Sequence, residues 1–214
     1  MSRNTGWPAA VLGPFHPYRG GIAHHTTLLA RTLATDHPVL GVNFTRLYPS
    51  FLFPGRTQYD ESADPLKAAD VRVRRLVDSV GPHTWLRAAR AVRDAGARLL
   101  VAQWWHPFFA PAYASVSHLV RRHGVRVVYL CHNVLPHEST RLDGLLVRVG
   151  LGAAHGYLVH SETDRAALEM LFPDRPYVLT PLPAFGFFSQ GRTDRETARQ
   201  QLQLDGHVVL FFGL

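Results

Sequence analysis

Cysteine is almost absent from this sequence, because Cys131 is the only one among 214 residues. A single cysteine excludes an intrachain disulfide, so the fold has to rest on its hydrophobic core. Cys131 stands in the apolar run 125–133, and we interpret it as a small core side chain. A chain without disulfides is expected in a reducing compartment.

Long apolar runs are missing as well. No stretch is long and charge-free enough to span a bilayer, and the opening stretch MSRNTGWPAAVLGPF lacks the length and cleavage site of a signal peptide. We therefore expect a cytoplasmic protein.

Lysine is nearly absent, since Lys67 is the only one and the other 22 basic residues are arginines. The formal net charge of +7 favours anionic partners, including a membrane surface. The arginines are dispersed, and we find no zinc spacing, basic helix or aromatic-interleaved basic stripe of the kinds used on nucleic acid. The sequence thus predicts no nucleic-acid partner, and it leaves open peripheral membrane contact on the cytoplasmic face.

Short apolar runs alternate with segments of helical periodicity along the whole chain. This alternation predicts an α/β fold, a Rossmann-like and mostly parallel sheet with helices on both faces. The segment 45–65 is rich in proline and aromatic residues and is expected to be a long irregular excursion. The expected strands are 8–13, 38–44, 97–104, 125–133, 156–161, 177–183 and 207–214, and the expected helices are 21–34, 83–96, 111–124, 140–154, 161–172 and 193–204.

A glycine pair, Gly20 and Gly21, stands between the first expected strand and the first expected helix. Glycine lets backbone amides approach an anion closely, and a helix N-terminus adds partial positive charge. The turn is neither G-x-G-x-x-G nor a Walker loop. It is a candidate phosphate site, with a purely conformational role as the alternative.

The stretch YLCHNVLPHE places His132 and Asn133 where a buried strand ends. Ligands of open α/β sheets bind beyond the carboxyl ends of the strands. A histidine there can bond a substrate or carry a proton near neutral pH, or it can simply cap the strand end. His137 and Glu138 form a second polar pair in the same loop.

Two further strand-end loops carry candidates. Trp105 and His106 lie in QWWHPFFAPAY, whose aromatic faces suit a stacked sugar or an apolar acceptor but equally suit core packing. Ser161 opens a helix in VHSETD, where it is a natural N-cap, with Asp164 three residues on. The thirteen histidines are scattered and predict no metal site, and no cofactor is expected.

Taken together, these residues resemble the N-terminal domain of family-4 glycosyltransferases of the GT-B fold. The resemblance covers nearly the whole chain and is carried by the order and spacing of five pieces: GPFHPYRGGIAHHTTLLARTL, LVAQWWHPFF, VVYLCHNVLPHE, GYLVHSETDRAAL and HVVLFFGL. The resemblance implies a domain that holds the acceptor, with a glycine turn that approaches the donor's diphosphate. His132 matches the histidine that contacts the transferred sugar.

The resemblance further implies retaining, metal-independent transfer of a sugar from a nucleotide-sugar donor to a glycan or lipid-linked acceptor. In that family a second domain supplies the nucleotide contacts and an acidic E-x7-E segment, neither of which occurs in this sequence. We therefore expect residues 1–205 to form the N-terminal domain and 206–214 to begin the donor-binding domain. The alternative is a Rossmann-like module that binds a sugar, nucleotide or protein without catalysis.

Overall fold

The computed structural model describes residues 6–50, 57–60, 71–136, 140–184, 186 and 193–211. By its internal contacts the chain separates into two units, Met1–Leu182 and Pro183–Leu214. The predicted polar pair His137 and Glu138 lies outside the described residues, as does much of the segment 45–65.

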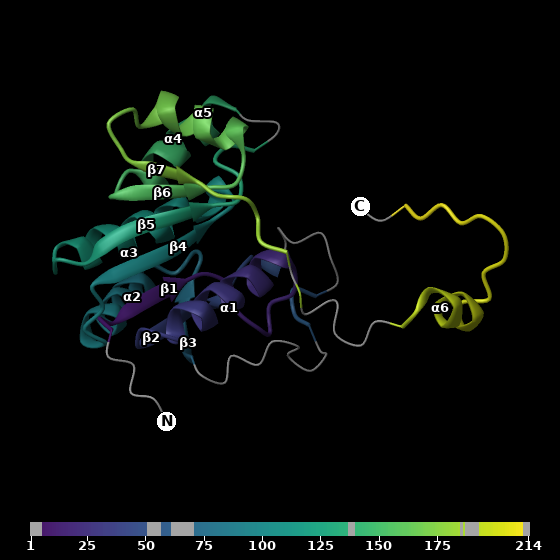
Figure 1. Ribbon diagram of the computed structural model, residues 1–214. Coiled ribbons are helices and arrows are strands. Elements are labelled where there is room, and N and C mark those ends of the chain that lie inside the picture. Colours follow the sequence, from purple (N-terminus) through teal and green to yellow (C-terminus); the bar gives the residue numbers. More distant parts are fainter. Residues whose placement is uncertain are drawn as a thin grey trace. The chain divides into compact units, whose positions relative to one another are not determined.

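The first unit is built on a seven-stranded sheet in the order β3-β2-β1-β4-β5-β6-β7, and every strand is parallel to its neighbours (Figure 1). The strands are β1 (Ala9–Leu12), β2 (Val39–Arg46), β3 (Arg72–Asp78), β4 (Leu99–Trp104), β5 (Arg126–Cys131), β6 (Gly156–Val159) and β7 (Tyr177–Leu179). The helices between them are α1 (Gly21–Ala34), α2 (Pro82–Asp94), the 3-10 turn η2 (Pro107–Phe109), α3 (Ala110–Arg121), α4 (Arg141–Leu151) and α5 (Glu162–Leu171).

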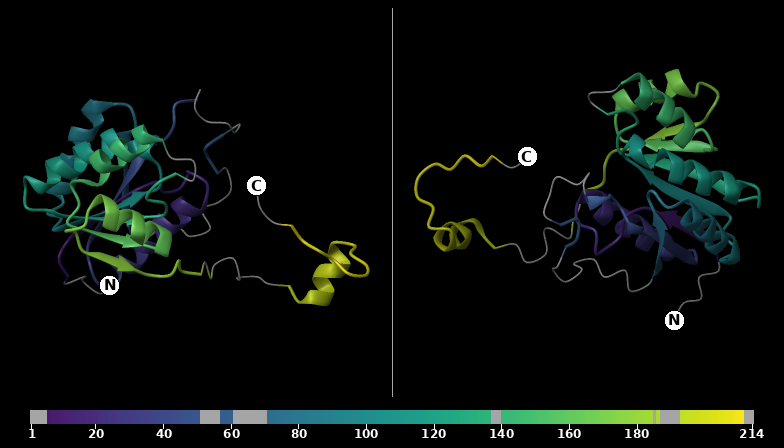
Figure 2. Two further views of the ribbon diagram at one scale, coloured as in Figure 1. Left: turned by 90° about the horizontal axis from the view of Figure 1, so that it is seen from above. Right: turned by 180° about the vertical axis from the view of Figure 1, so that it is seen from behind.

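Helices cover both faces of the sheet, as the alternation of side chains along β1 shows. Ala10 and Leu12 point into the larger core, which includes buried residues of α2 and α3. Val11 points the other way, into a smaller core that it shares with Ala30 and Ala34 of α1. Helices α2, α3 and α4 pack side by side, with α1 on the opposite face (Figures 1 and 2). The predicted Rossmann-like architecture is thus confirmed.

The strand order reverses at β1, which lies between β2 and β4. The loops after β1 and β4 therefore leave the sheet toward opposite sides, and a crevice opens between them. In open α/β sheets this switch point is where ligands bind. The predicted glycine turn follows β1 and the predicted Trp-Trp-His loop follows β4, so the fold places both at this crevice.

The edge strand β3 was missed by the sequence analysis. Its segment alternates valine with arginine, and four of its seven residues are too polar or exposed to read as a buried strand. Among the described strands it pairs only with β2, and Arg72, Arg74 and Arg75 are exposed. Arg75 bonds the carbonyl oxygens of Phe44 and Thr45 at 3.0 and 3.1 Å, which ties the edge strand to β2.

The second unit contains one described helix, α6 (Arg195–Gln201), capped by the Asp194 carboxylate through the amides of Glu196 and Thr197. The strand predicted at 207–214 is wrong over 207–211, where the described residues form no strand. A strand needs a partner for its amide and carbonyl groups, and these residues pair with none. Their apolar side chains are exposed, Val209 by 97% and Phe211 by 86%.

Within the described part of the chain, no helix combines the length and apolar character needed to cross a membrane.

Candidate functional site

The predicted glycine turn opens α1 at the crevice. Gly20 adopts φ +109°, a conformation that favours glycine, and its carbonyl accepts the first helical bond from the His24 amide at 3.2 Å. The three amides before His24 have no partner within a helix by its geometry. A Cβ built on Gly21 would meet no atom within 4 Å, so open space faces this helix end. The turn can therefore present backbone donors to an anion.

Asn43 holds the loop that carries this turn. The residue lies in β2 and is completely buried. Its Oδ1 accepts from the amide of Phe15 at 3.0 Å, and its Nδ2 donates to the carbonyls of Phe15 and His16, each at 3.3 Å. One side chain thus fixes the path of the chain between β1 and α1.

A pocket of about 250 Å³ joins the glycine turn to the loop after β4. It brings together Gly20, Gly21 and Trp105, three of the residues predicted to bind substrate. The sequence analysis did not single out the other residues that line it, which are Pro14, Arg19, Ile22, Ala23, Leu47, Tyr48 and Gln58. The volume lies below the roughly 300–1,000 Å³ of sites for drug-sized ligands, and it suits one sugar ring better than a whole nucleotide sugar.

The wall of this pocket is aromatic and preorganised. The Trp105 indole N–H donates to the Tyr48 hydroxyl at 3.0 Å, so these polar groups are bound to each other. The Gln58 amide in turn exchanges two hydrogen bonds of 2.9 Å with the backbone of Tyr48. Tyr48 stacks on Phe108 with 5.6 Å between ring centres. The exposed Arg19 adds positive charge at the rim.

Three histidines from separate elements meet one helical turn further along α1. His25 of α1, His132 at the end of β5 and His160 at the end of β6 have ring centres 4.9 to 5.7 Å apart. The His132 amide continues the sheet ladder by bonding the Trp104 carbonyl at 2.8 Å. The sequence predicted His132 but neither of the other two, because only the strand order brings them together.

Gln103 of β4 organises this cluster. Its Oε1 lies 2.6 Å from His132 Nε2, and the same amide interacts with His25. Because a carbonyl oxygen only accepts, His132 Nε2 carries the proton, which leaves Nδ1 as the acceptor of the ring. The Gln103 side chain is fully buried, and its Nε2 has no hydrogen-bond partner among the described residues.

Two members of the cluster, His25 and His132, are uncharged at neutral pH. Burial, reinforced by the charges of His25 and His160, lowers the pKa of His132 to about 3. Burial and the charge of His160 lower the pKa of His25 to about 4, although the bond to Gln103 opposes this. Neutral imidazoles bond hydroxyl groups and add no charge for a phosphate. The two halves of the crevice therefore differ: anion-binding amides at the glycine turn, and neutral hydrogen-bonding groups at the cluster.

Two of the predicted residues, Ser161 and His106, cap helices. Ser161 caps α5, and its hydroxyl donates to Asp164 Oδ2 at 2.6 Å. Asp164 Oδ1 accepts from the Val134 amide at 2.6 Å, so this cap also holds the loop after His132. The ring of His106 caps η2 by accepting from the Phe108 amide at 3.1 Å.

Asn133 is exposed beside His132. Among the described residues, no group of three or more histidine, cysteine, aspartate or glutamate side chains has an arrangement that could hold a metal ion.

Comparison with known proteins finds likeness in structure only, since no family model and no curated protein matches the chain. A sucrose-phosphate synthase structure from Thermosynechococcus elongatus superposes with a TM-score of 0.51 at 14% identity, covering 92% of this chain and 99% of that one. An E. coli protein described as trehalose-6-phosphate, bound with UDP-2-fluoro glucose, gives a TM-score of 0.51 at 12% identity. That match covers 92% of this chain and 54% of the E. coli chain.

At these identities the likeness shows the fold alone. The class that it defines is an α/β Rossmann-like domain of the kind found in GT-B glycosyltransferases, as the sequence predicted. A weaker likeness, to a short-chain dehydrogenase/reductase from Serratia marcescens, has a TM-score of 0.47 and bears no weight.

Proposed function

We propose that this chain is the acceptor-side half of a family-4 glycosyltransferase of the GT-B type. The reaction would move a sugar from a nucleotide-sugar donor to a glycan or lipid-linked acceptor, with retention and without a metal. One observation carries the proposal: the glycine turn, the aromatic wall and the histidine cluster adjoin one crevice at the sheet's switch point.

Each part of the crevice has a distinct task in this proposal. The free amides at Gly21 and the two residues after it face the leaving diphosphate and stabilise its growing charge. His132, held by Gln103 with its Nδ1 as acceptor, takes a hydrogen bond from a hydroxyl of the transferred sugar. The Trp105 wall receives the acceptor, because a flat aromatic surface packs against a sugar ring.

The second domain of such an enzyme supplies the nucleotide contacts, so this half holds mainly the sugar. We further infer that the sequence 206–214 begins that domain. The small pocket volume and the lack of an acidic E-x7-E segment in the sequence support this division of labour. Peripheral contact with the cytoplasmic face of a membrane would suit a lipid-linked acceptor.

Saturation-transfer NMR on the whole 214-residue chain tests the proposal. With UDP-glucose and GDP-mannose as probes, the hexose protons of at least one should receive saturation from the protein. His132→Ala should weaken the binding of that nucleotide sugar at least about tenfold, which is the loss expected for a positioned polar contact. Arg87→Gln, an exposed change on α2, is the control and should leave it intact.

Two results would contradict the proposal. One is the absence of hexose saturation with every nucleotide sugar in a broad panel. The other is equal saturation in the wild-type chain and in His132→Ala.

A further inference from the structure

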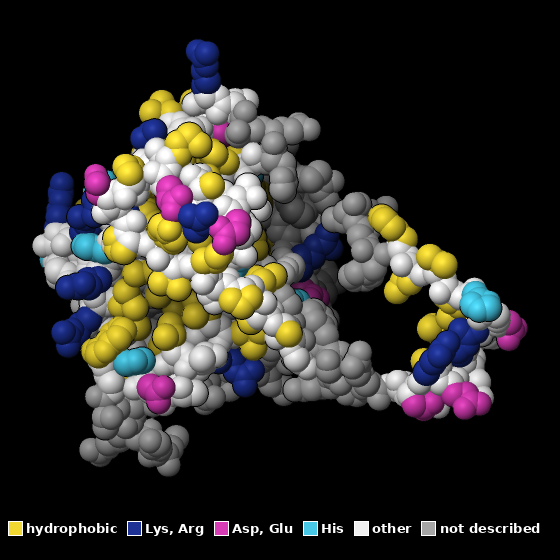
Figure 3. All heavy atoms as spheres, turned by 45° about the horizontal axis from the view of Figure 1, so that its top comes forward, with side chains coloured by type: hydrophobic (Ala, Val, Ile, Leu, Met, Phe, Trp, Pro, Cys, Tyr) yellow, Lys and Arg dark blue, Asp and Glu magenta, His cyan; other side chains and the backbone are white. Residues whose placement is uncertain are grey.

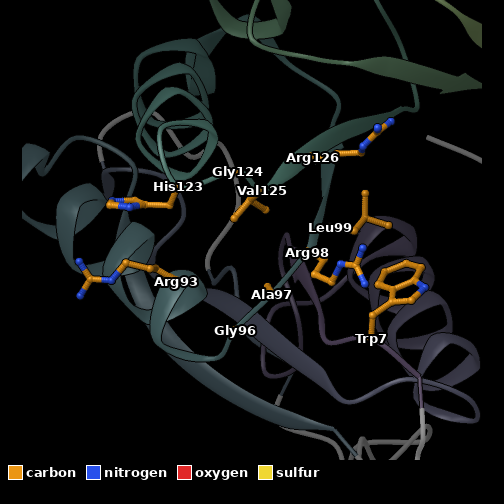
Figure 4. Close-up of a pocket in the computed structure, with 10 residues that line it drawn as sticks. All are labelled: Trp7, Arg93, Gly96, Ala97, Arg98, Leu99, His123, Gly124, Val125 and Arg126. Carbon is orange, nitrogen blue, oxygen red and sulfur yellow. The ribbon is translucent and has the colours of Figure 1, made fainter.

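The amino ends of the strands carry a second cavity, at the opposite end of the sheet from the crevice. It encloses about 430 Å³ between the turns that end α2 and α3 (Figure 4). Its lining contains cations, an indole and no carboxylate: Trp7, Arg93, Gly96, Ala97, Arg98, Leu99, His123, Gly124, Val125 and Arg126. Figure 3 shows several Arg side chains, in dark blue, along the left edge of the first unit.

Two of these arginines have unused hydrogen-bond donors. The guanidinium groups of Arg98 and Arg126 form no ion pair or hydrogen bond within the described part of the chain. Arg93 differs, since its Nη2 lies 2.7 Å from the Asp94 carboxylate. Each free guanidinium offers five N–H donors in a planar fork that matches a phosphate.

The helix ends do not explain these arginines. Carbonyl groups at a helix C-terminus attract cations, but here backbone amides already bond them. Gly96 and Ala97 donate to the last turn of α2, and Gly124 and Val125 donate to that of α3, at 2.8 to 3.3 Å. Gly96 and Gly124 adopt φ +67° and +78°, which these closing turns require.

Cations also lie beside the cavity. Burial, and then the charges of Arg121 and Arg126, lower the pKa of the neighbouring His155. Two acidic residues lie next to this lining: Asp94 follows Arg93, and the carbonyl oxygen of Asp36 accepts from the Gly6 amide at 3.1 Å, directly before Trp7. Asp94 is engaged by Arg93, and Asp36 lies next to His37, whose ring packs 4.2 Å from that of Trp7. The lining of the cavity therefore combines arginine side chains with the indole ring of Trp7.

We propose that this cavity is a binding site for a nucleotide, with the phosphate on Arg98 and Arg126 and the base against Trp7. In Figure 4 Arg98 lies next to Trp7, and Arg126 lies further along the same side, beyond Leu99, across from Arg93 and His123. The phosphate accepts charged hydrogen bonds from these exposed guanidinium groups, and the base stacks on the indole. The site is separate from the crevice and does not depend on the proposed transferase activity. Its occupant acts as an effector and not as a substrate.

Calorimetric titration of the 214-residue chain at low ionic strength tests this site, with AMP, ribose 5-phosphate and pyrophosphate as probes. AMP should bind more tightly than ribose 5-phosphate. Arg98→Gln combined with Arg126→Gln should weaken AMP at least about tenfold, since charged hydrogen bonds are lost. Trp7→Leu should weaken AMP but leave pyrophosphate unchanged, with Trp7→Phe retaining part of the difference.

Two controls separate the site from general charge and from the crevice. Arg87→Gln combined with Arg195→Gln removes the same charge elsewhere and should leave AMP binding unchanged. Gly21→Val should also leave it unchanged. The proposal is overturned if AMP does not bind at millimolar concentration, if the control pair weakens it equally, or if Gly21→Val abolishes it. Equal affinity for AMP and ribose 5-phosphate would overturn the role given to Trp7.

Discussion

Gly13 leaves room for the Gln103 side chain that bonds the histidine cluster. A Cβ on Gly13 would lie 2.8 Å from Gln103 Cγ and 3.0 Å from Thr26 Oγ1, closer than packed side chains allow. The glycine at the end of β1 therefore decides where the amide that holds His132 can lie. Nothing in the sequence pairs Gly13 with Gln103, because their contact depends on β1 and β4 being neighbours.

We predict that Gly13→Ala lowers the free energy of unfolding by about 1–3 kcal/mol, the usual cost of overpacking. The matched control is Gly144→Ala in α4, where a Cβ meets nothing within 4 Å. That change should stabilise by about 0.5–1 kcal/mol, because alanine favours a helix over glycine. Urea unfolding of both variants measures the two changes in the free energy of unfolding. If Gly13→Ala stabilises the protein as Gly144→Ala does, the close packing at Gly13 is refuted.

The neutral histidines predict a pH dependence of stability. Their pKa values, about 3 for His132 and about 4 for His25, lie below the ordinary value near 6.5. Between the folded-state pKa values and the ordinary value near 6.5, the unfolded chain binds more protons than the folded chain. The free energy of unfolding therefore rises with pH in this range. Lowering the pH from 7 to 4.5 should reduce the free energy of unfolding by at least about 2 kcal/mol.

Replacing a cluster histidine should flatten that slope. His132→Gln removes one group whose pKa differs between the folded and unfolded states, whereas His118→Gln replaces an exposed histidine of α3 and serves as the control. Unfolding followed by circular dichroism from pH 4.5 to 7 measures the slopes. A slope unchanged by His132→Gln would show that the ring is not held neutral.

At the scale of elements, the loop between β1 and α1 depends on β2. Asn43→Ala leaves buried backbone groups of Phe15 and His16 without partners, so we predict a loss of about 2–4 kcal/mol in stability. Asn133→Ala, the change of an exposed asparagine, should stay within about 0.5 kcal/mol of wild type. If Asn133 binds substrate, as its place at the strand end predicts, its variant lowers hexose saturation without lowering stability. Chemical unfolding measures the first effect, and a near-neutral Asn43→Ala would contradict the clamp.

Most elements could be predicted from periodicity, since β1, β2, β4, β5 and β6 are runs of mainly apolar and buried residues. The strand β7 is also an apolar run, although its three residues are exposed. The strand β3 escaped because its arginines face solvent at the sheet edge, although the alternation in Val71-Arg72-Val73-Arg74 is a signal for a strand. The strand predicted over 207–211 was wrong for a different reason. An apolar, β-branched run satisfies the sequence pattern, but strand structure also needs a partner that the described residues do not provide.

The site could be predicted only in part, for a similar reason. Trp105 and His132 follow strands directly, and Gly20 and Gly21 lie where the loop after the first strand enters a helix, so their place at the carboxyl ends was readable from the sequence. His25 and His160 lie on a helix and at a later strand end, and Gln103 looks like an ordinary strand residue. Their meeting is a consequence of the strand order, which no local pattern contains.

For the whole molecule, the proposed division between two domains predicts weak catalysis by this chain alone. The 214 residues should transfer sugar from a nucleotide-sugar donor with a kcat well below about 1 per second, because the main donor contacts would belong to the second domain. A product assay by mass spectrometry with a panel of sugar acceptors measures this. Turnover at the rates typical of enzymes would contradict the division.

The central claim is that the crevice at the carboxyl ends of β1 and β4 holds the sugar of a nucleotide sugar. Amide chemical-shift mapping tests it most directly, with a nucleotide sugar added to ¹⁵N-labelled protein carrying Arg98→Gln and Arg126→Gln so that the second cavity is silent. The account predicts that shifts gather at the amides of Gly20, Gly21, Trp105 and His132. Shifts that avoid these amides, or that gather instead at Gly96 and Gly124, would contradict it.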